Sequence, residues 1–336
     1  MKDFLKNLSV FCLIILLPLI VGYLYFDPFR VLYNYSEFNV PSYIDLDRDY
    51  VSTEMFIKHK DQYHYNSFIL GSSRTVAFNV SSWQKHLDVS ASPFKYDAYG
   101  ESIYGIYKKL KYLDATHAKI DNVLLIIDED LTFNTYQNVK EVLGIKHPAI
   151  SGESHIMFQK IFFRAYLNPK FLYTFYSGTL TRAFKNKTKD SEEQHLAIMD
   201  TITNQLTWTS SDNRIEEDSI GYYANAKSFF CVRSGETVDK MQKIRGIRLS
   251  MLQEIGEILK KNNTHYKVVI SPIYDQVKFS DEDRKVLKEI FGENLYDFSG
   301  KNAFTDFPGN YYRDAYHYRP IVGDSILKII YAPASN

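Results

Sequence analysis

Residues 123–130 read VLLIIDED, an uninterrupted apolar run that ends in three acidic side chains. A run of consecutive branched aliphatic residues predicts a strand that is buried on both faces, as in a parallel sheet. Further short apolar runs are separated by helical patterns, which is typical of an α/β protein. These runs are 67–70, 94–97, 267–270 and 294–297. The sequence therefore predicts a three-layer, doubly wound, mainly parallel five-stranded sheet.

Helical patterns lie between and after these runs. Ser102 is a typical N-cap, and it begins a predicted helix that ends near Leu113. Apolar residues near helical spacing predict a long helix over 238–261 and a closing helix over 321–331. Between about 131 and 235 apolar runs and helical patterns no longer alternate, so we predict a helical insert. Its aromatic cluster has three interpretations, namely packing on the core, lying against a membrane, or meeting a membrane partner.

The amino-terminal segment 8–26 contains no charged side chain. A helix of this length spans about 28 Å, close to the hydrocarbon thickness of a bilayer. Lys2 and Lys6 precede it, which favours an inside amino terminus. A cleaved signal peptide is the alternative, but the segment lacks a clear small-residue cleavage site. We predict a transmembrane signal anchor over 1–26, with the rest of the chain in the periplasm or outside the cell, on a bacterial inner membrane.

The remaining chain divides by composition. Residues 27–63 begin with a tyrosine-rich stretch without clear periodicity, which predicts a stalk, and 64–336 form the predicted globular domain. The 40 Lys and Arg balance 40 Asp and Glu, so nothing points to nucleic acid as a partner. The chain has only two cysteines, which excludes a disulfide scaffold and a four-cysteine zinc site. Nucleotide-binding and metalloprotease motifs are missing from the sequence, and we expect neither a metal nor a cofactor.

Two short motifs carry candidate chemistry. Gly-Ser-Ser-Arg at 71–74 follows the first predicted strand, where a serine can direct its hydroxyl into the crevice beyond the sheet. Asp314 and His317 lie three positions apart before the last predicted helix, a spacing that lets a carboxylate orient an imidazole as a general base. A plain turn explains either motif alone. Their conjunction is a stronger signal, because it combines a serine after the first predicted strand with Asp-x-x-His just before the last predicted helix.

This arrangement resembles the SGNH (GDSL-like) hydrolase superfamily, whose nucleophile follows the first strand and whose Asp-x-x-His lies near the carboxyl end. The resemblance implies a flavodoxin-like sheet, Ser73 as nucleophile, His317 as base and Asp314 as its orienting partner. The backbone N–H groups of Ser73 and Gly100 would form the oxyanion hole. At the place of the family's third block, Gly-x-Asn-Asp, residues 127–130 read Ile-Asp-Glu-Asp, with neither glycine nor asparagine, and this departure removes a normal oxyanion donor.

The resemblance covers roughly 64–130 and 238–331 and excludes the insert. Ser72, Arg74 and Asp128 are candidate substrate contacts beside the nucleophile. For Arg74, a salt bridge that stabilises the turn is an equally good interpretation. The acidic cluster at 128–130 has two further interpretations, a cation site and a solvated strand end, of which the second is the simpler.

Together with the anchor, these blocks resemble the membrane-anchored branch that works beside membrane-bound O-acyltransferases. This resemblance implies that an acyl group, acetyl first of all, passes through Ser73 to hydroxyls of a cell-envelope or extracellular polysaccharide. The implied partners are that glycan acceptor and an integral membrane O-acyltransferase. Two alternatives stay open, a carbohydrate esterase that uses water as acceptor and a non-catalytic accessory subunit of such a system.

Overall fold

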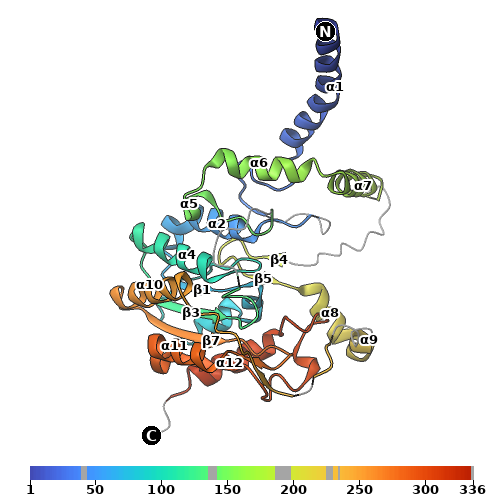
Figure 1. Ribbon diagram of the computed structural model, residues 1–336. Coiled ribbons are helices and arrows are strands. Elements are labelled where there is room, and N and C mark those ends of the chain that lie inside the picture. Colours follow the sequence, from blue (N-terminus) through green and yellow to red (C-terminus); the bar gives the residue numbers. More distant parts are fainter. Residues whose placement is uncertain (39–43, 135–141, 186–197, 225–229, 234, 334–336) are drawn as a thin grey trace.

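The computed structural model describes residues 1–38, 44–134, 142–185, 198–224, 230–233 and 235–333. For positions 5, 8, 9, 11–13, 15 and 182–185 it describes the backbone only. A five-stranded sheet lies at the centre (Figure 1). In spatial order its strands are β2 (Pro93–Lys95), β1 (Ser67–Leu70), β3 (Asn122–Ile127), β7 (His265–Ile270) and β9 (Leu295–Asp297).

Every neighbouring pair of strands in this sheet is parallel. Strand β3 is central, and its Leu125 aligns with Leu70 on one side and Val268 on the other. Its apolar residues 123–127 are fully buried, as a strand covered on both faces requires. The prediction of an α/β fold with a parallel five-stranded sheet is therefore confirmed.

Two apolar cores cover the two faces of the sheet. Successive side chains of a strand point to opposite faces, so Phe68 and Leu70 enter one core and Ile69 enters the other. The first core is completed by α2 (Arg48–Tyr63), α4 (Ile103–Ala115), α10 (Ile247–Lys261) and α11 (Asp281–Phe291). The second is completed by α3 (Val80–Gln84) and α12 (Pro320–Ile330). The sheet is thus the middle of three layers.

The helix boundaries agree with the sequence except at one place. Helix α4 begins directly after Ser102, and α12 lies within one residue of the predicted closing helix. Helix α10 begins at Ile247, nine residues after the predicted start, because Gly246 takes a left-handed φ of 55°. At the predicted start of the helix, Thr237 and Val238 instead form β6 (Thr237–Val238), which pairs with β8 (Val277–Lys278).

The segment predicted as a stalk differs from that prediction. The described part of 27–63 belongs to the globular body, since Phe29, Val31 and Phe38 are buried in the first core. The segment ends in α2, whose Met55 and Phe56 are fully buried. A helix that is covered on most of its surface shows little amphipathic periodicity. This is why the sequence pattern did not reveal α2.

The insert forms two helical groups in the structure. The first comprises α5 (Pro148–Ser151), α6 (His155–Tyr166) and α7 (Pro169–Lys185). The second comprises α8 (Thr209–Glu217) and α9 (Ser219–Ala224), preceded by the strand pair β4 (Ile198–Met199) and β5 (Leu206–Thr207). Figure 1 shows the first group beside the end of α1 and the second group on the opposite half of the body. The insert is therefore mostly helical where it is described.

Helix α1 (Lys2–Phe26) projects from the body and ends at Asp27, which takes a left-handed conformation (Figure 1). In the part of the chain that the structure describes, no helix combines the length and the apolar character that a membrane crossing needs. The anchor stays a prediction.

Candidate functional site

The turn at 71–74, which we call the nucleophile turn after the predicted role of Ser73, joins β1 to a short 3-10 helix, η1 (Ser73–Ala77). Gly71 passes so close to β3 that a Cβ atom would lie 2.9 Å from both the Cβ atom and the carbonyl oxygen of Ile126, and only glycine fits there. Ser72 caps η1, because its Oγ accepts a hydrogen bond from the Arg74 N–H at 3.2 Å. Ser73 is therefore the first residue of η1, at the carboxyl edge of the sheet.

Ser73, His317 and Asp314 come together in one hydrogen-bonded chain. The Ser73 Oγ lies 2.8 Å from His317 Nε2, and His317 Nδ1 lies 2.5 Å from Asp314 Oδ2. The other oxygen of Asp314 accepts hydrogen bonds from the backbone N–H groups of Tyr316 and His317 at 3.0 Å each. With Nδ1–H directed at the carboxylate, Nε2 carries the lone pair that can accept the serine proton. The arrangement is that of a serine–histidine–aspartate triad.

Asp314 remains ionised in this setting. Burial raises the pKa of its carboxyl group, but the hydrogen bond and the charge of His317, with the backbone N–H groups of His317 and Tyr316, outweigh burial. The pKa of Asp314 therefore lies below its usual range. An ionised carboxylate can hold the imidazole in one orientation and stabilise an imidazolium.

The two backbone N–H groups predicted to bind an oxyanion belong to Ser73 and Gly100. Within the described chain, the N–H groups of Ser73 and Gly100 donate to no backbone acceptor. Gly100 has φ +58° and lies on the loop between β2 and α4, and the Ala98 N–H of this loop donates to the Gly71 carbonyl at 3.3 Å. The loop therefore runs alongside the nucleophile turn. The oxyanion role of Gly100 itself stays a prediction.

A buried charge cluster supports the loop that carries Gly100. The Lys109 Nζ lies 2.8 Å from Glu101 Oε2 and 3.1 Å from Asp49 Oδ2. The Lys146 Nζ lies 2.6 Å from Glu101 Oε1 and 3.1 Å from Asp49 Oδ2. Burial raises the pKa of Asp49, but the two lysines outweigh it and the pKa is lowered. Sequence reasoning missed this cluster, because its members come from the expected stalk, the core and the insert.

Arg74 is fully occupied by partners within the protein. Its guanidinium pairs with both oxygens of Asp130, at 2.6 and 2.7 Å, and lies 3.3 Å from Asp128. Its Nε donates to the carbonyl oxygen of Tyr316 at 3.0 Å. Burial lowers the pKa of Arg74, but the two carboxylates outweigh it and the pKa is raised. Arg74 thus joins the nucleophile helix, the end of β3 and the loop of His317, as the salt-bridge interpretation expects.

Ser72 and Asp128 are buried and bonded to one another. The Ser72 Oγ donates to Asp128 Oδ2 at 2.5 Å, and the Ser271 Oγ donates to Asp128 Oδ1 at 2.6 Å. With these internal partners, both side chains position the nucleophile turn against the ends of β3 and β7. A contact between either of them and substrate stays a prediction.

Trp208 places an aromatic ring from the insert against the base. Its ring centroid lies 4.8 Å from that of His317 and 4.9 Å from that of Tyr312. The Tyr312 hydroxyl donates to Asp212 Oδ1 of α8 at 2.8 Å. Sequence reasoning did not single out Trp208. The available signal was the rarity of the residue, since the chain has two tryptophans.

Lys95 is a fully buried cation beneath η1. Its Nζ donates to the carbonyl oxygen of Thr75 at 2.8 Å. The Thr75 Oγ1 donates to Asp97 Oδ2 at 2.9 Å, and Arg48 Nε donates to Asp97 Oδ1 at 2.9 Å. Lys95 therefore supports the helix that carries the nucleophile.

We expect Lys95 to make stability depend on pH. Burial lowers the pKa of Lys95 from 10.5 to about 7, although Asp97 opposes this shift. Below the lowered pKa, Lys95 is charged in the folded state, and the full cost of burying that charge lowers the stability. Between the folded-state pKa and the unfolded-state pKa, the unfolded chain binds one proton that the folded chain does not. The free energy of unfolding should therefore rise with pH by up to about 1.4 kcal/mol per pH unit, the value for one proton.

Urea unfolding at a series of pH values between these limits measures this slope. Lys95→Met should remove the contribution of Lys95, whereas Lys85→Met at an exposed position should keep the wild-type slope. Equal slopes in Lys95→Met and in the wild type would contradict the expectation.

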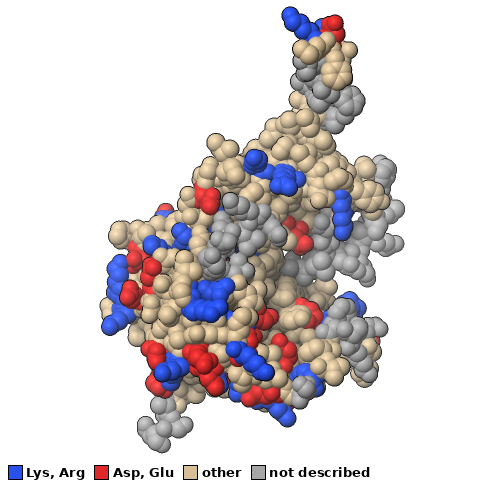
Figure 2. Space-filling view, in the orientation of Figure 1, with Lys and Arg blue, Asp and Glu red and all other residues tan. Residues whose placement is uncertain are grey.

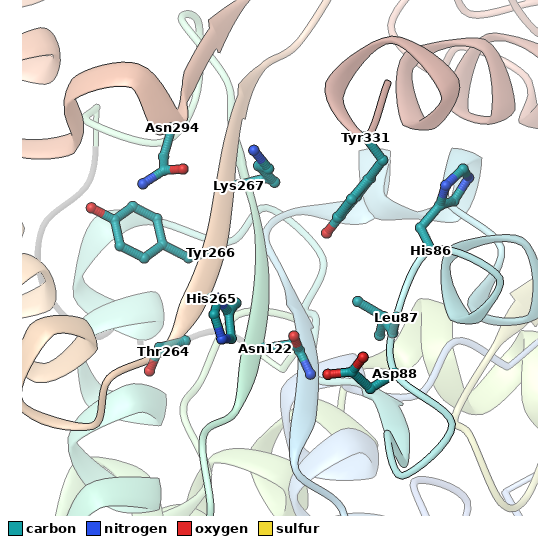
Figure 3. Close-up of a pocket in the computed structure, with 10 residues that line it drawn as sticks. All are labelled: His86, Leu87, Asp88, Asn122, Thr264, His265, Tyr266, Lys267, Asn294 and Tyr331. Carbon is teal, nitrogen blue, oxygen red and sulfur yellow. The ribbon is translucent and has the colours of Figure 1, made fainter. Parts of the chain in front are cut away.

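A pocket of about 340 Å³ opens at the opposite edge of the sheet (Figure 3). Asn122 and His265, the first residues of β3 and β7, line it together with His86 and Tyr331. Ser73 follows the carboxyl end of β1, and ligands of doubly wound sheets bind at the carboxyl ends. The pocket is therefore separate from the triad. Among the described residues, no group of His, Cys, Asp and Glu could hold a metal ion.

No family model matches the chain, and no curated protein sequence matches it. What the site can do chemically follows from its own geometry. A serine hydroxyl, an imidazole and a carboxylate form one hydrogen-bonded chain, an arrangement suited to acyl transfer through a serine.

Proposed function

We propose that this chain is a membrane-anchored, outward-facing serine acyltransferase of the SGNH type. It moves an acyl group, acetyl first of all, to hydroxyls of a cell-envelope or extracellular polysaccharide. The observation that carries the proposal is the chain from Ser73 through His317 to Asp314, with separations of 2.8 and 2.5 Å.

The first half-reaction forms an acyl-serine. His317 Nε2 takes the proton of Ser73 Oγ as that oxygen bonds to the carbonyl carbon of the donor. The oxyanion accepts hydrogen bonds from the N–H groups of Ser73 and Gly100. The bond to the leaving group then breaks, and the leaving group takes the proton from His317.

The second half-reaction transfers the acyl group. His317 removes the proton from an acceptor hydroxyl, whose oxygen bonds to the acyl carbon, and the departing Ser73 Oγ takes the proton back. The Trp208 ring beside His317 supports a sugar as acceptor, because a flat aromatic face can pack against the C–H face of a sugar ring.

The location at a membrane is supported by α1. Many of its described apolar side chains are exposed, among them Phe4, Ile14 and Val21, and the segment 8–26 is free of charge. An anchor with the amino terminus inside holds the site beside a bilayer, where an integral membrane O-acyltransferase is the proposed partner that supplies the acyl group.

The two alternatives rest on specific features. An esterase would use the same three residues with water in place of the sugar hydroxyl. An accessory subunit is favoured by the third block, where 127–130 offers neither the glycine nor the asparagine of the family's pattern.

One assay separates these functions. The full chain is incubated with 4-nitrophenyl acetate and a neutral oligosaccharide, and the products are followed by mass spectrometry. A transferase yields acetylated oligosaccharide and an esterase yields free acetate only. Product formation equal to that of Ser73→Ala would contradict both and favour the accessory subunit.

A further inference from the structure

Helix α6 runs across the base of α1, and α7 lies to one side of it (Figure 1). Tyr23 of α1 packs on Phe163 of α6, with ring centroids 5.2 Å apart, and Phe26 packs on Phe175 of α7 at 5.6 Å. At Gly22 a Cβ atom would lie 2.5 Å from the Tyr176 hydroxyl, so α1 lies close against the side chains of these helices. The direction of α1 is therefore tied to the plane of α6 and α7.

One face of α6 holds the helix to the body. Phe158 and Phe162, four positions apart, are both buried. Phe158 stacks on Tyr50 of α2 at 5.4 Å, and Phe162 packs on Phe29 at 5.4 Å. Side chains two positions away on a helix point to the opposite side. The opposite face of α6 is thus directed away from the body.

That outward face mixes exposed apolar and cationic side chains. On α6, Ile156, Lys160 and Arg164 follow one another at four-residue spacing, and Ile156 is 80% exposed. On α7, Tyr173 is 77% exposed and Leu180 is 58% exposed. We call this surface the platform face and define it by Ile156, Lys160, Arg164, Lys170, Tyr173 and Leu180.

The charged side chains of these two helices are all positive. Residues 155–185 contain five Lys and Arg and no Asp or Glu, in a chain whose net charge is zero. Figure 2 shows blue side chains on a tan surface over α6, below the projecting α1. Aliphatic and aromatic residues between cations, without acids, fit anionic lipid headgroups. A protein interface core would instead be depleted in lysine.

We propose that the platform face lies on the surface of an anionic lipid bilayer, the same bilayer that α1 enters. The inference rests on the membrane location proposed above. Interfacial helices bury their apolar side chains at the boundary of headgroups and acyl chains while their cations meet lipid phosphates. Helices α1, α6 and α7 then all contact the membrane, whereas the anchor alone would supply only α1. The catalytic domain is held at a set tilt, and Ser73 at a set distance from the lipid surface.

Site-directed fluorescence on the full chain tests this contact. Cys12 and Cys231 are replaced by serine, and the polarity-sensitive dye NBD is attached at Ile156→Cys or Tyr173→Cys. The matched control is Ile329→Cys, an exposed apolar position on α12, which lies at the far end of the body from α1 (Figure 1). The proteins are reconstituted into phosphatidylcholine vesicles with or without phosphatidylglycerol.

We expect the probes at 156 and 173 to shift to shorter wavelength and to lose emission to doxyl-labelled lipid, more so with phosphatidylglycerol. The probe at 329 should lose emission to aqueous iodide alone. Lys160→Glu combined with Arg164→Glu should remove the effect of phosphatidylglycerol, because about fivefold in binding is lost with each cation.

Two outcomes overturn the proposal. If iodide quenches the probes at 156 and 173 as it does the probe at 329, the platform face is free in water. If the probes are shielded from both quenchers, in detergent as well as in vesicles, the face is covered by protein. A probe at Leu17→Cys reports separately whether α1 is in lipid. If doxyl-labelled lipid does not quench this probe, both the predicted anchor and the proposal are contradicted. The acyl-transfer assay does not depend on any of these signals.

Discussion

Replacing Ser73 by alanine should abolish covalent labelling by a serine-directed phosphonate and lower acyl turnover at least about 10⁴-fold. The reason is geometric, because the Ser73 Oγ is the hydroxyl that lies 2.8 Å from His317 Nε2. Without it no acyl-serine forms, and His317 has no proton to take in the first half-reaction. Intact-mass spectrometry after exposure to the phosphonate, together with initial rates on an acetyl ester, measures both effects.

Ser72→Ala is the matched control, since it removes the neighbouring hydroxyl. That hydroxyl donates to Asp128 at 2.5 Å and is buried, so labelling should survive. Stability should fall by about 1–3 kcal/mol, because a buried carboxylate loses a donor and η1 loses its cap. Labelling that persists in Ser73→Ala or disappears in folded Ser72→Ala would overturn the assignment of the nucleophile. A wild-type chain that takes no label would favour the accessory subunit.

Arg74→Met should destabilise the protein by about 3–5 kcal/mol, the cost of breaking a buried ion pair by removing one partner. The substitution leaves Asp128, which is fully buried, without its cation. It also removes the paired hydrogen bonds to Asp130 and the one to the Tyr316 carbonyl beside His317. Urea unfolding of the full chain measures the loss.

Two controls separate the role of Arg74 from a general effect of losing a cation. Adding Asp128→Asn and Asp130→Asn to Arg74→Met should restore part of the stability, because no unpaired charge then remains in the interior. Lys261→Met breaks an exposed pair with Asp114 and should change stability by less than about 1 kcal/mol. If Arg74→Met costs no more than Lys261→Met, Arg74 does not hold the site together.

The parallel sheet was predictable because the apolar composition of its strands indicates that they are buried. Residues 123–127 contain no polar side chain, and a chain can satisfy such a run only by burying both faces. Helix α2 shows the opposite case. It is buried on most sides, yet its residues include charges such as Arg48 and Asp49, whose partners lie elsewhere in the chain. A local pattern could not distinguish it from an exposed stalk.

The site was predictable to the extent that its residues are local to strand ends and turns. Asp314 and His317 are three positions apart, so one turn suffices to bring them into contact. Asp130 and Tyr316, two partners of Arg74, are 56 and 242 positions away from it in the chain, and Trp208 is 109 positions before His317. Those contacts depend on how the loops of different strands meet.

By itself the sequence determined the α/β class, the apolar strands and the two motifs that hold the triad, since each follows from the chemistry of neighbouring residues. Only the tertiary structure decided that Arg74 is occupied, that 27–63 joins the core and that α6 and α7 are fixed to the base of α1. The physical reason is that burial and pairing of charges are properties of contacts between distant segments. The periodicity of residues along the chain does not predict such contacts.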